Sequence, residues 1–381
     1  MSELYNILSI FVTGGLLLAC GLMLLFTKTP GSPLLGNYRK ARYMLACAYL
    51  FFVVFEIVEY LLQVPEPSVP GVASVQTVSL AVAVTQAFLF TFAILALVEV
   101  RFPGWRYIFC ETLPVLLFVA GVFAAYLCCP EESFGTVFYA FAGIYALQMI
   151  RYTFLFLAAY RRFRFRMDNY FSDMEAGRLH WLAFSFFAAL AVGVTALLSA
   201  LFMSDVLILS FTVVLDIFYT YFAIRFVDYA HQFHTIEHAM DGEGTEETVQ
   251  PYVQSEAGMP RHDGEAFVLL EKHMEEWIAG KGFTEQGITV SILAARLCTN
   301  SKYLSVYINT RKRQTFREWI NELRIEEAKS LLLQHPEMTV NEIAHCSGFS
   351  NRSSFLRLFK KHADVSTTEW KKRAFRVKVK S

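Results

Sequence analysis

The sequence predicts an all-α protein in which a bundle of about seven transmembrane helices precedes a smaller helical domain. Apolar residues make up 55% of the 381 residues and charged residues only 18%, a balance that membrane spans explain and an ordinary soluble enzyme does not show. The apolar residues before position 230 occur in long uninterrupted runs. After position 287, apolar residues instead recur at helical spacing, in a pattern that is present twice.

Seven apolar stretches are long enough to cross a bilayer as helices, which takes about 20 residues. They lie at 5–27, 44–62, 75–98, 107–128, 134–160, 181–203 and 206–226. The first, third and fifth loops between them contain Lys or Arg, whereas the even-numbered loops contain neither. Since basic loops stay in the cytoplasm, this pattern predicts an outside N-terminus and a cytoplasmic C-terminal part.

Four charged residues are candidate intramembrane groups, because charge inside a span is costly and usually faces the bundle interior in pairs. They are Glu56, Glu59, Arg151 and Asp216. Pairing of Arg151 with Asp216 or another acid would lock the bundle. Ligand or proton sensing by Glu56, Glu59 or Asp216 is a second interpretation, and a transport pathway is a third. No feature of the sequence identifies a ligand.

The transmembrane domain is predicted to occupy residues 1–230. A juxtamembrane helix and an acidic segment rich in Gly and Pro follow at 231–264, a composition typical of a flexible linker. Residues 265–279 have the pattern of an amphipathic helix. We therefore expect the C-terminal domain, 265–381, to begin with this helix.

The C-terminal domain contains a helix-turn-helix pattern at about 339–363. A short helix with small and apolar residues at its centre leads into a turn through Ser347 and Gly348. The second helix alternates apolar with basic residues at helical spacing. Its basic residues are Arg352, Arg357, Lys360 and Lys361, and its apolar residues are Phe355, Leu358 and Phe359. A basic second helix of this kind is typical of nucleic-acid binding.

A weaker copy of the pattern lies about 50 residues upstream, at about 289–310. Thr289-Val290 matches Thr339-Val340, and Leu293-Ala294 matches Ile343-Ala344. Between the copies, residues 315–333 have the apolar spacing of one long helix. The sequence therefore predicts two helix-turn-helix units joined by a helix.

The segment 265–376 resembles the DNA-binding domain of the AraC/XylS-type (arabinose-regulator) family of bacterial transcription factors. The matching residues are Gly348-Phe349-Ser350, Phe355, Arg357, Phe359-Lys360, Trp370-Lys371 and the run Leu323-Arg324-Ile325-Glu326-Glu327-Ala328. Two departures follow the second recognition helix, where Asp364 and Thr367 replace the family's usual Gly and Pro. They leave open how the chain turns into its last helix.

The resemblance implies that both second helices enter the major groove and read bases from their exposed faces. The expected base-reading residues are Lys302, Ser305, Val306 and Asn309 in the first unit, and Arg352, Ser353, Leu356 and Arg357 in the second. The residues expected at phosphates are Arg311, Lys312, Lys360 and Lys361. The net charge of about +10 after residue 287 supports this, although the whole chain is neutral.

The resemblance and the spans together imply a membrane-anchored, one-component transcription regulator of the bacterial inner membrane. The implied partners are double-stranded promoter DNA, membrane lipid, RNA polymerase and either a second copy or a membrane sensor protein. No cofactor, metal site or enzymatic activity is expected. Two alternatives stay open: a receptor or transporter whose helix-turn-helix domain only docks proteins, and a regulator released by proteolysis.

Overall fold

The computed structural model describes residues 10–27, 36–63, 72–99, 105–172, 176–202, 205–240 and 264–378. Over these ranges the regular elements are all helices, which confirms the predicted fold class. The chain divides into two compact units. The bundle unit comprises Met1–Phe163 and Gly177–His238, and the C-terminal unit comprises Arg164–Ala176 and Ala239–Ser381.

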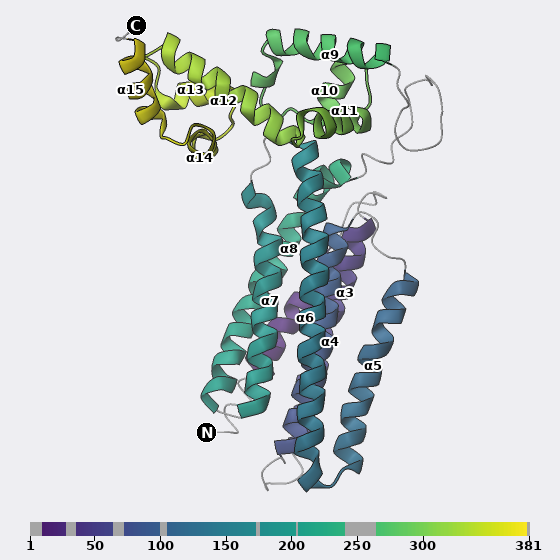
Figure 1. The fold of residues 1–381 in the computed structure, drawn as a ribbon. Coiled ribbons are helices and arrows are strands. Elements are labelled where there is room, and N and C mark those ends of the chain that lie inside the picture. The colour runs from purple at the N-terminus through teal and green to yellow at the C-terminus, as the bar shows by residue number, and fades with distance from the viewer. Residues whose placement is uncertain are drawn as a thin grey trace. The chain divides into compact units, whose positions relative to one another are not determined.

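The bundle unit consists of long apolar helices (Figure 1). They are η1 (Ile10–Gly14), α2 (Gly15–Phe26), α3 (Gly36–Gln63), α4 (Val72–Val98), α5 (Trp105–Cys128), α6 (Glu131–Tyr170), α7 (Ala176–Phe202) and α8 (Asp205–Met240). Helix α6 is 40 residues long, and its last residues, from Arg164, belong to the C-terminal unit.

Five described helices are long and apolar enough to cross a membrane. Their candidate spans are Gln76–Val98, Arg106–Cys128, Glu132–Tyr170, His180–Phe202 and Ser210–Tyr229. The first predicted span corresponds to a shorter apolar helix, Phe11–Phe26, and the second lies within α3. The count of seven transmembrane helices therefore stays a prediction, and the described residues contain five candidate spans.

Helix α4 is the most enclosed candidate span, and polar side chains tie its neighbours together. The Gln86 amide donates to the carbonyl of Ala48 on α3 at 2.7 Å, and the Tyr219 hydroxyl of α8 donates to Gln86 at 3.1 Å. The Tyr38 hydroxyl of α3 donates to the carbonyl of Phe226 at 3.1 Å. Buried polar groups need such partners, so these bonds fix α3, α4 and α8 in register.

The C-terminal unit contains nine shorter helices within the described range 264–378. They are α9 (Gly264–Ala279), η3 (Gly282–Thr284), α10 (Val290–Arg296), α11 (Ser301–Tyr307), η4 (Ile308–Lys312), α12 (Phe316–Gln334), α13 (Val340–Cys346), α14 (Arg352–Ala363) and α15 (Thr367–Lys378). Helix α9 coincides with the amphipathic helix that the sequence predicts.

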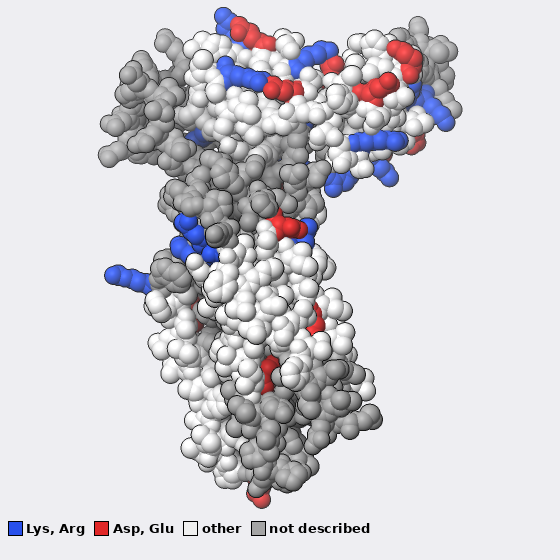
Figure 2. Space-filling view, turned by 180° about the vertical axis from the view of Figure 1, so that it is seen from behind, with Lys and Arg blue, Asp and Glu red and all other residues white. Residues whose placement is uncertain are grey.

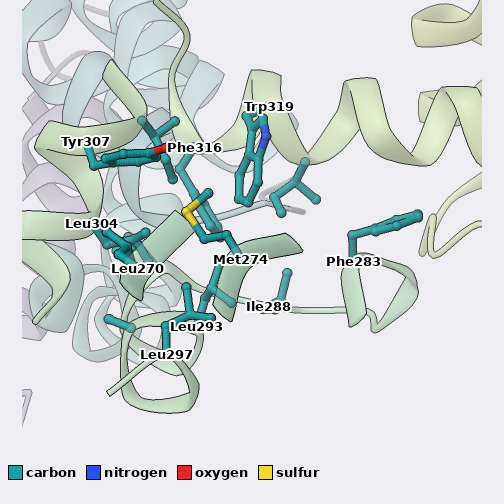
Figure 3. Close-up of a cluster of buried hydrophobic side chains, with 14 residues drawn as sticks. Leu270, Met274, Phe283, Ile288, Leu293, Leu297, Leu304, Tyr307, Phe316 and Trp319 are labelled. Atoms are coloured by element: carbon teal, nitrogen blue, oxygen red, sulfur yellow. The ribbon is translucent and has the colours of Figure 1, made fainter. Parts of the chain in front are cut away.

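Two hydrophobic cores hold this unit together, one on each side of the middle of α12. The first (Figure 3) joins α9, η3, α10, α11 and the start of α12, with Met274, Leu293 and Trp319 among its members. The second joins the end of α12 to α13 and α14, with Phe355 and Phe359 fully buried. Each core closes one helix-turn-helix unit, and α12 contributes side chains to both.

Candidate nucleic-acid interface

The first helix-turn-helix unit is formed by α10 and α11, and a side chain caps each helix. The Thr289 hydroxyl accepts a hydrogen bond from the backbone N–H of Ile292 at 3.2 Å. The Asn300 side chain accepts one from the N–H of Tyr303 at 2.7 Å, as the sequence predicts. Such caps satisfy backbone donors that have no partner inside the helix. They define where α11, the expected recognition helix, begins.

The second unit is formed by α13 and α14, and α13 begins with a complete capping box. The Thr339 N–H and hydroxyl donate to one carboxylate oxygen of Glu342 at 2.7 and 2.8 Å, and the N–H of Glu342 donates back to the hydroxyl at 3.3 Å. The bonds from the Thr339 backbone and side chain lower the pKa of the Glu342 carboxyl. This reciprocal pair is the sequence signature of a helix start.

The turn between α13 and α14 depends on a glycine. Gly348 has a φ of +94°, and a Cβ there would lie 2.6 Å from the carbonyl oxygen of Thr284. Only glycine tolerates both the left-handed backbone and this close approach. Asn351 then caps α14 by accepting from the N–H of Ser353 at 2.7 Å. The turn residue and the cap together fix the direction in which α14 leaves the turn.

Helix α14 separates a buried apolar face from an exposed basic one. Phe355 and Phe359 are 0% exposed. Leu356 and Leu358 are both half-buried and pack against the same core, so Leu356 is less free than the sequence suggests. The exposed residues are Arg352, Ser353, Arg357, Lys360, Lys361 and His362. The exposed face is therefore one on which cations dominate.

The cations of α14 differ from several others in the C-terminal unit because no carboxylate pairs with them. Within the described ranges, Arg352, Arg357, Lys360 and Lys361 form no ion pair. By contrast, acidic partners neutralise four other cations: Lys281 pairs with Glu327, Arg296 with Glu285, Arg317 with Asp168 and Lys329 with Glu326. Unpaired cations on one helix face form the electrostatic footprint expected for phosphate binding.

The outward face of α11 is smaller and less basic. Lys302 and Val306 are exposed, while Ser305 and Asn309 are half-buried. Arg311 and Lys312 follow on η4 and are both exposed. Leu304, Tyr307 and Ile308 are buried in the first core. The structure thus places the predicted residues of the first unit together along α11 and η4.

A buried arginine lies on α12 between the two helix-turn-helix units, and no sequence pattern predicted its burial. Arg324 on α12 is 0% exposed. Its guanidinium donates to the carbonyl oxygens of Phe283 at 2.8 Å and Glu285 at 2.7 Å. The Gln286 amide also donates to the carbonyl of Phe349 at 3.2 Å. These bonds join the segment before α10 to α12 and to the turn that precedes α14.

The two departures after α14 have clear local roles. Asp364 has a φ of +55° and occupies the left-handed position that ends α14. Aspartate adopts this conformation more readily than most residues other than glycine. Thr367 is 4% exposed and begins α15, and the Ser366 hydroxyl accepts from the N–H of Glu369 at 3.2 Å. The chain therefore turns into its last helix without the family's Gly and Pro.

The predicted intramembrane charges occupy three separate places in the bundle unit. Arg151 on α6 pairs with Glu111 on α5 and not with Asp216. Asp216 accepts from the Thr13 hydroxyl at 3.0 Å. Glu56 is half-buried on α3, and the side chain of Glu59 lies outside the described residues. No two of the described predicted charges are therefore brought together.

Figure 2 shows how charge is distributed over one face of the molecule. Most of the bundle unit is white there, whereas Lys, Arg, Asp and Glu gather on the C-terminal unit. A mostly uncharged surface on this face is expected if lipid surrounds the bundle, because charged side chains are costly in hydrocarbon. Charges of both signs on the C-terminal unit are expected for a domain in water.

Comparisons with known proteins match the C-terminal unit. Residues 293–373 match a family model described as "Helix-turn-helix domain". An uncharacterized HTH-type transcriptional regulator of Escherichia coli (strain K12), YijO, is 32% identical over 85 residues, which are 22% of this chain and 30% of that protein. The match thus spans less than a third of this relative's length. No solved structure matches the chain. The expected resemblance is therefore confirmed for the C-terminal helix-turn-helix region.

Proposed function

We propose that this chain is a membrane-anchored transcription regulator that binds specific promoter DNA through α11 and α14. The observation that carries the proposal is the row of exposed, unpaired cations on α14, beside a glycine turn and a capped helix start. The match to a helix-turn-helix domain and to an HTH-type regulator supports DNA as the partner. We propose a binding protein and not an enzyme.

DNA reading would follow from the geometry of the two recognition helices. In helix-turn-helix proteins the second helix lies in the major groove, and residues near its start contact base edges. Arg352, Ser353, Leu356 and Arg357 would do this in the second unit, and Lys302, Ser305, Val306 and Asn309 in the first. Arg357 is suited to guanine, whose O6 and N7 accept a bidentate pair of hydrogen bonds worth about 1–3 kcal/mol.

Phosphate contacts would orient the protein on the duplex. Lys360 and Lys361 lie in the last turn of α14, and Arg311 and Lys312 end η4. Phosphate contacts carry no sequence information, but they supply much of the affinity. Helix α12 has 19 residues, a length of about 28 Å. Two units at the ends of such a helix can reach successive major grooves, which lie about 34 Å apart on one face of DNA.

The bundle unit would anchor the regulator in the bacterial inner membrane, with the C-terminal domain (265–381) in the cytoplasm. Its five candidate spans support anchoring, and the basic loops of the sequence support this orientation. The linker within 241–263 would join the membrane domain (1–230) and its juxtamembrane helix to the DNA-binding domain. RNA polymerase, a second copy of the chain or a membrane sensor protein would be further partners.

Signal reception would take place within the bundle. Asp216, whose carboxylate accepts from Thr13, and Glu56 would sense protons or a ligand, and the Arg151–Glu111 pair would hold α5 against α6. An ionisable group in a span is a functional candidate by default.

Selection of DNA from a random pool by the purified full-length protein in lipid nanodiscs tests this proposal. We expect enrichment of a long asymmetric site with two conserved blocks about one helical turn apart. The variant Arg352→Ala/Arg357→Ala should lose enrichment of the block read by α14 and keep the other block. Equal enrichment of all sequences by the wild-type protein would contradict specific recognition.

A further inference from the structure

The end of helix α6 packs against the first helix-turn-helix unit. Arg164–Ala176 belong to the same compact unit as the chain from Ala239 onward. Residues 168–172, which we call the docking segment, form hydrogen bonds and an ion pair with α10, α12 and the residue that precedes the cap of α10. The sequence predicts only a basic loop after residue 160, so this contact is a finding of the structure.

The centre of the contact is a short antiparallel pairing at the start of α10. Phe171 pairs with Thr289, the residue that caps α10. Ser172 is 1% exposed and donates twice to the carbonyl oxygen of Ile288, from its N–H at 3.2 Å and from its hydroxyl at 2.7 Å. The docking segment is therefore seated on the residues that begin the first helix of this unit.

Three hydroxyl groups extend the contact to the recognition helix. The Ser291 hydroxyl, in the first turn of α10, lies 3.2 Å from the hydroxyl of Tyr170. The Ser301 hydroxyl lies 3.1 Å from that of Ser291. Ser301 is the first residue of α11. The ring of Tyr170 also packs against the first hydrophobic core. The docking segment thus contacts the start of α10 directly and is linked to the first residue of α11 only through Ser291.

An ion pair fixes the other end of the docking segment. Asp168 accepts from the guanidinium of Arg317, near the start of α12, at 3.1 Å, and the two side chains are only 25% and 21% exposed. Partial burial reduces the screening by water and salt that weakens exposed pairs. Asp168 therefore ties the segment to the helix that carries both units.

The docking segment covers a part of the first helix-turn-helix unit that is expected to lie against DNA. In helix-turn-helix complexes the first helix crosses the DNA backbone, and the first residues of the second helix enter the groove. Hydroxyl groups are common phosphate ligands. We propose that the docking segment is an autoinhibitory latch that competes with DNA for the surface at the start of α10, where Ser291 bonds to Ser301 of α11. This inference rests on the proposed DNA-binding function.

The latch connects DNA binding to the bundle through one continuous element. Helix α6 runs without a break from Glu131 to Tyr170, and its residues as far as Phe163 belong to the bundle unit. A signal that moves or turns α6 would carry the docking segment with it. The signal can shift the equilibrium between the docked and undocked states only by as much as it favours one of them energetically. The undocked state would be the one that binds DNA through both units.

A disulfide placed across the antiparallel pairing tests the latch. Opposed residues in a non-hydrogen-bonded antiparallel pair have Cα atoms about 4.5 Å apart, which a disulfide spans. The double variant Phe171→Cys/Thr289→Cys is prepared as the full chain in nanodiscs. Its affinity for the selected DNA is measured before and after reduction. The single variants, which retain the native cysteines, control for unwanted pairing and for loss of the Thr289 cap.

We expect the oxidised double variant to bind at least about tenfold more weakly than its reduced form, since closing the latch removes the contacts of one unit. Reduction should restore the affinity of the single variant Thr289→Cys. Equal affinities of the oxidised and reduced forms, with the disulfide confirmed by mass spectrometry, would overturn the latch. If reduced wild-type protein selects no specific DNA, the proposed function itself fails.

Loosening the latch gives the opposite prediction. Asp168→Ala with Tyr170→Phe removes the ion pair and one hydrogen bond but keeps the aromatic ring in the core. Affinity for the selected DNA should rise about two- to tenfold, the size expected for the loss of such bonds. Arg161→Ala, on the exposed face of the same helix outside the docking segment, should leave affinity unchanged. Unchanged or weaker binding by the loosened variant would show that docking does not oppose DNA.

Discussion

The guanidinium of Arg324 lies over the ring of Phe349, with 5.8 Å between its central carbon and the ring centroid. Arg324 belongs to α12 and Phe349 to the turn of the second helix-turn-helix unit. The same guanidinium donates to two carbonyls beside η3, at the edge of the first unit. A single side chain therefore contacts both helix-turn-helix units.

Replacement of Arg324 by Leu should destabilise the C-terminal unit by about 2–4 kcal/mol. The change leaves the carbonyls of Phe283 and Glu285 without their donor in a buried place, and hydrogen bonds to charged groups are worth about 1.5–3 kcal/mol each. Peptide-resolved hydrogen exchange of the full chain measures the loss. Arg357→Leu is the matched control: Arg357 is exposed and unpaired within the described ranges, so it should lose DNA binding and keep its exchange protection.

Replacement of Gly348 by Ala should lower the free energy of unfolding more than replacement of Gly287 by Ala. Both glycines have positive φ, +94° and +72°, but only at Gly348 would a Cβ collide with backbone, 2.6 Å from the oxygen of Thr284. At Gly287 nothing lies within 4 Å. We expect about 1 kcal/mol at Gly287 from the left-handed backbone alone and clearly more at Gly348. Denaturant unfolding followed by hydrogen exchange compares the free energies of unfolding of the two variants. Equal losses of stability would contradict the close approach of Gly348 to the backbone of Thr284.

Acid should weaken the start of α13 through Glu342. Its pKa is lowered in the folded protein by the bonds from Thr339. The stabilisation by the carboxylate is therefore fully present above the ordinary carboxyl pKa of about 4.3 and is lost as the pH falls through the lowered folded value. Glu342→Gln keeps a capping side chain that does not titrate. The exchange protection of α13 should fall with acid in the wild type more than in this variant.

Sequence reasoning identified the local structure of the C-terminal unit but not its longer contacts. The fold class, the two helix-turn-helix units and the apolar face with Phe355 and Phe359 follow from short patterns, because helical spacing acts within a few residues. The contact of Ser172 with Ile288 joins residues 116 positions apart. No local pattern encodes such a pairing.

The buried arginine and the spans show two other limits of sequence reasoning. Arg324 lies beside Leu323 and Ile325 in a run that the family resemblance includes, but a charged residue is ordinarily expected at the surface. Its burial depends on carbonyl acceptors from another segment. In the bundle, the sequence predicts that Arg151 pairs with Asp216 or another acid, and only the packing of α5 against α6 makes Glu111 its partner.

Salt and base specificity should separate the roles of two neighbouring cations on α14. Lys360→Gln should weaken binding to all sequences and reduce the slope of log affinity against log salt by about 0.9, as expected for one lost phosphate contact. Arg357→Ala should instead cost about 1–3 kcal/mol on the selected site and relax the preference at one base pair. Titrations at several salt concentrations, on selected and scrambled DNA, distinguish the two. Similar behaviour of both variants would contradict the assigned roles.

Chromatin immunoprecipitation of the full-length protein, tagged after Ser381, tests the central claim most directly. The wild type and the Arg352→Ala/Arg357→Ala variant are compared at equal levels, with fragment size and membrane location checked on blots. We expect discrete promoter peaks for intact wild-type protein in the membrane fraction and their loss in the variant. Identical peaks in both would contradict DNA reading by α14, and peaks carried only by a soluble fragment would contradict regulation from the membrane.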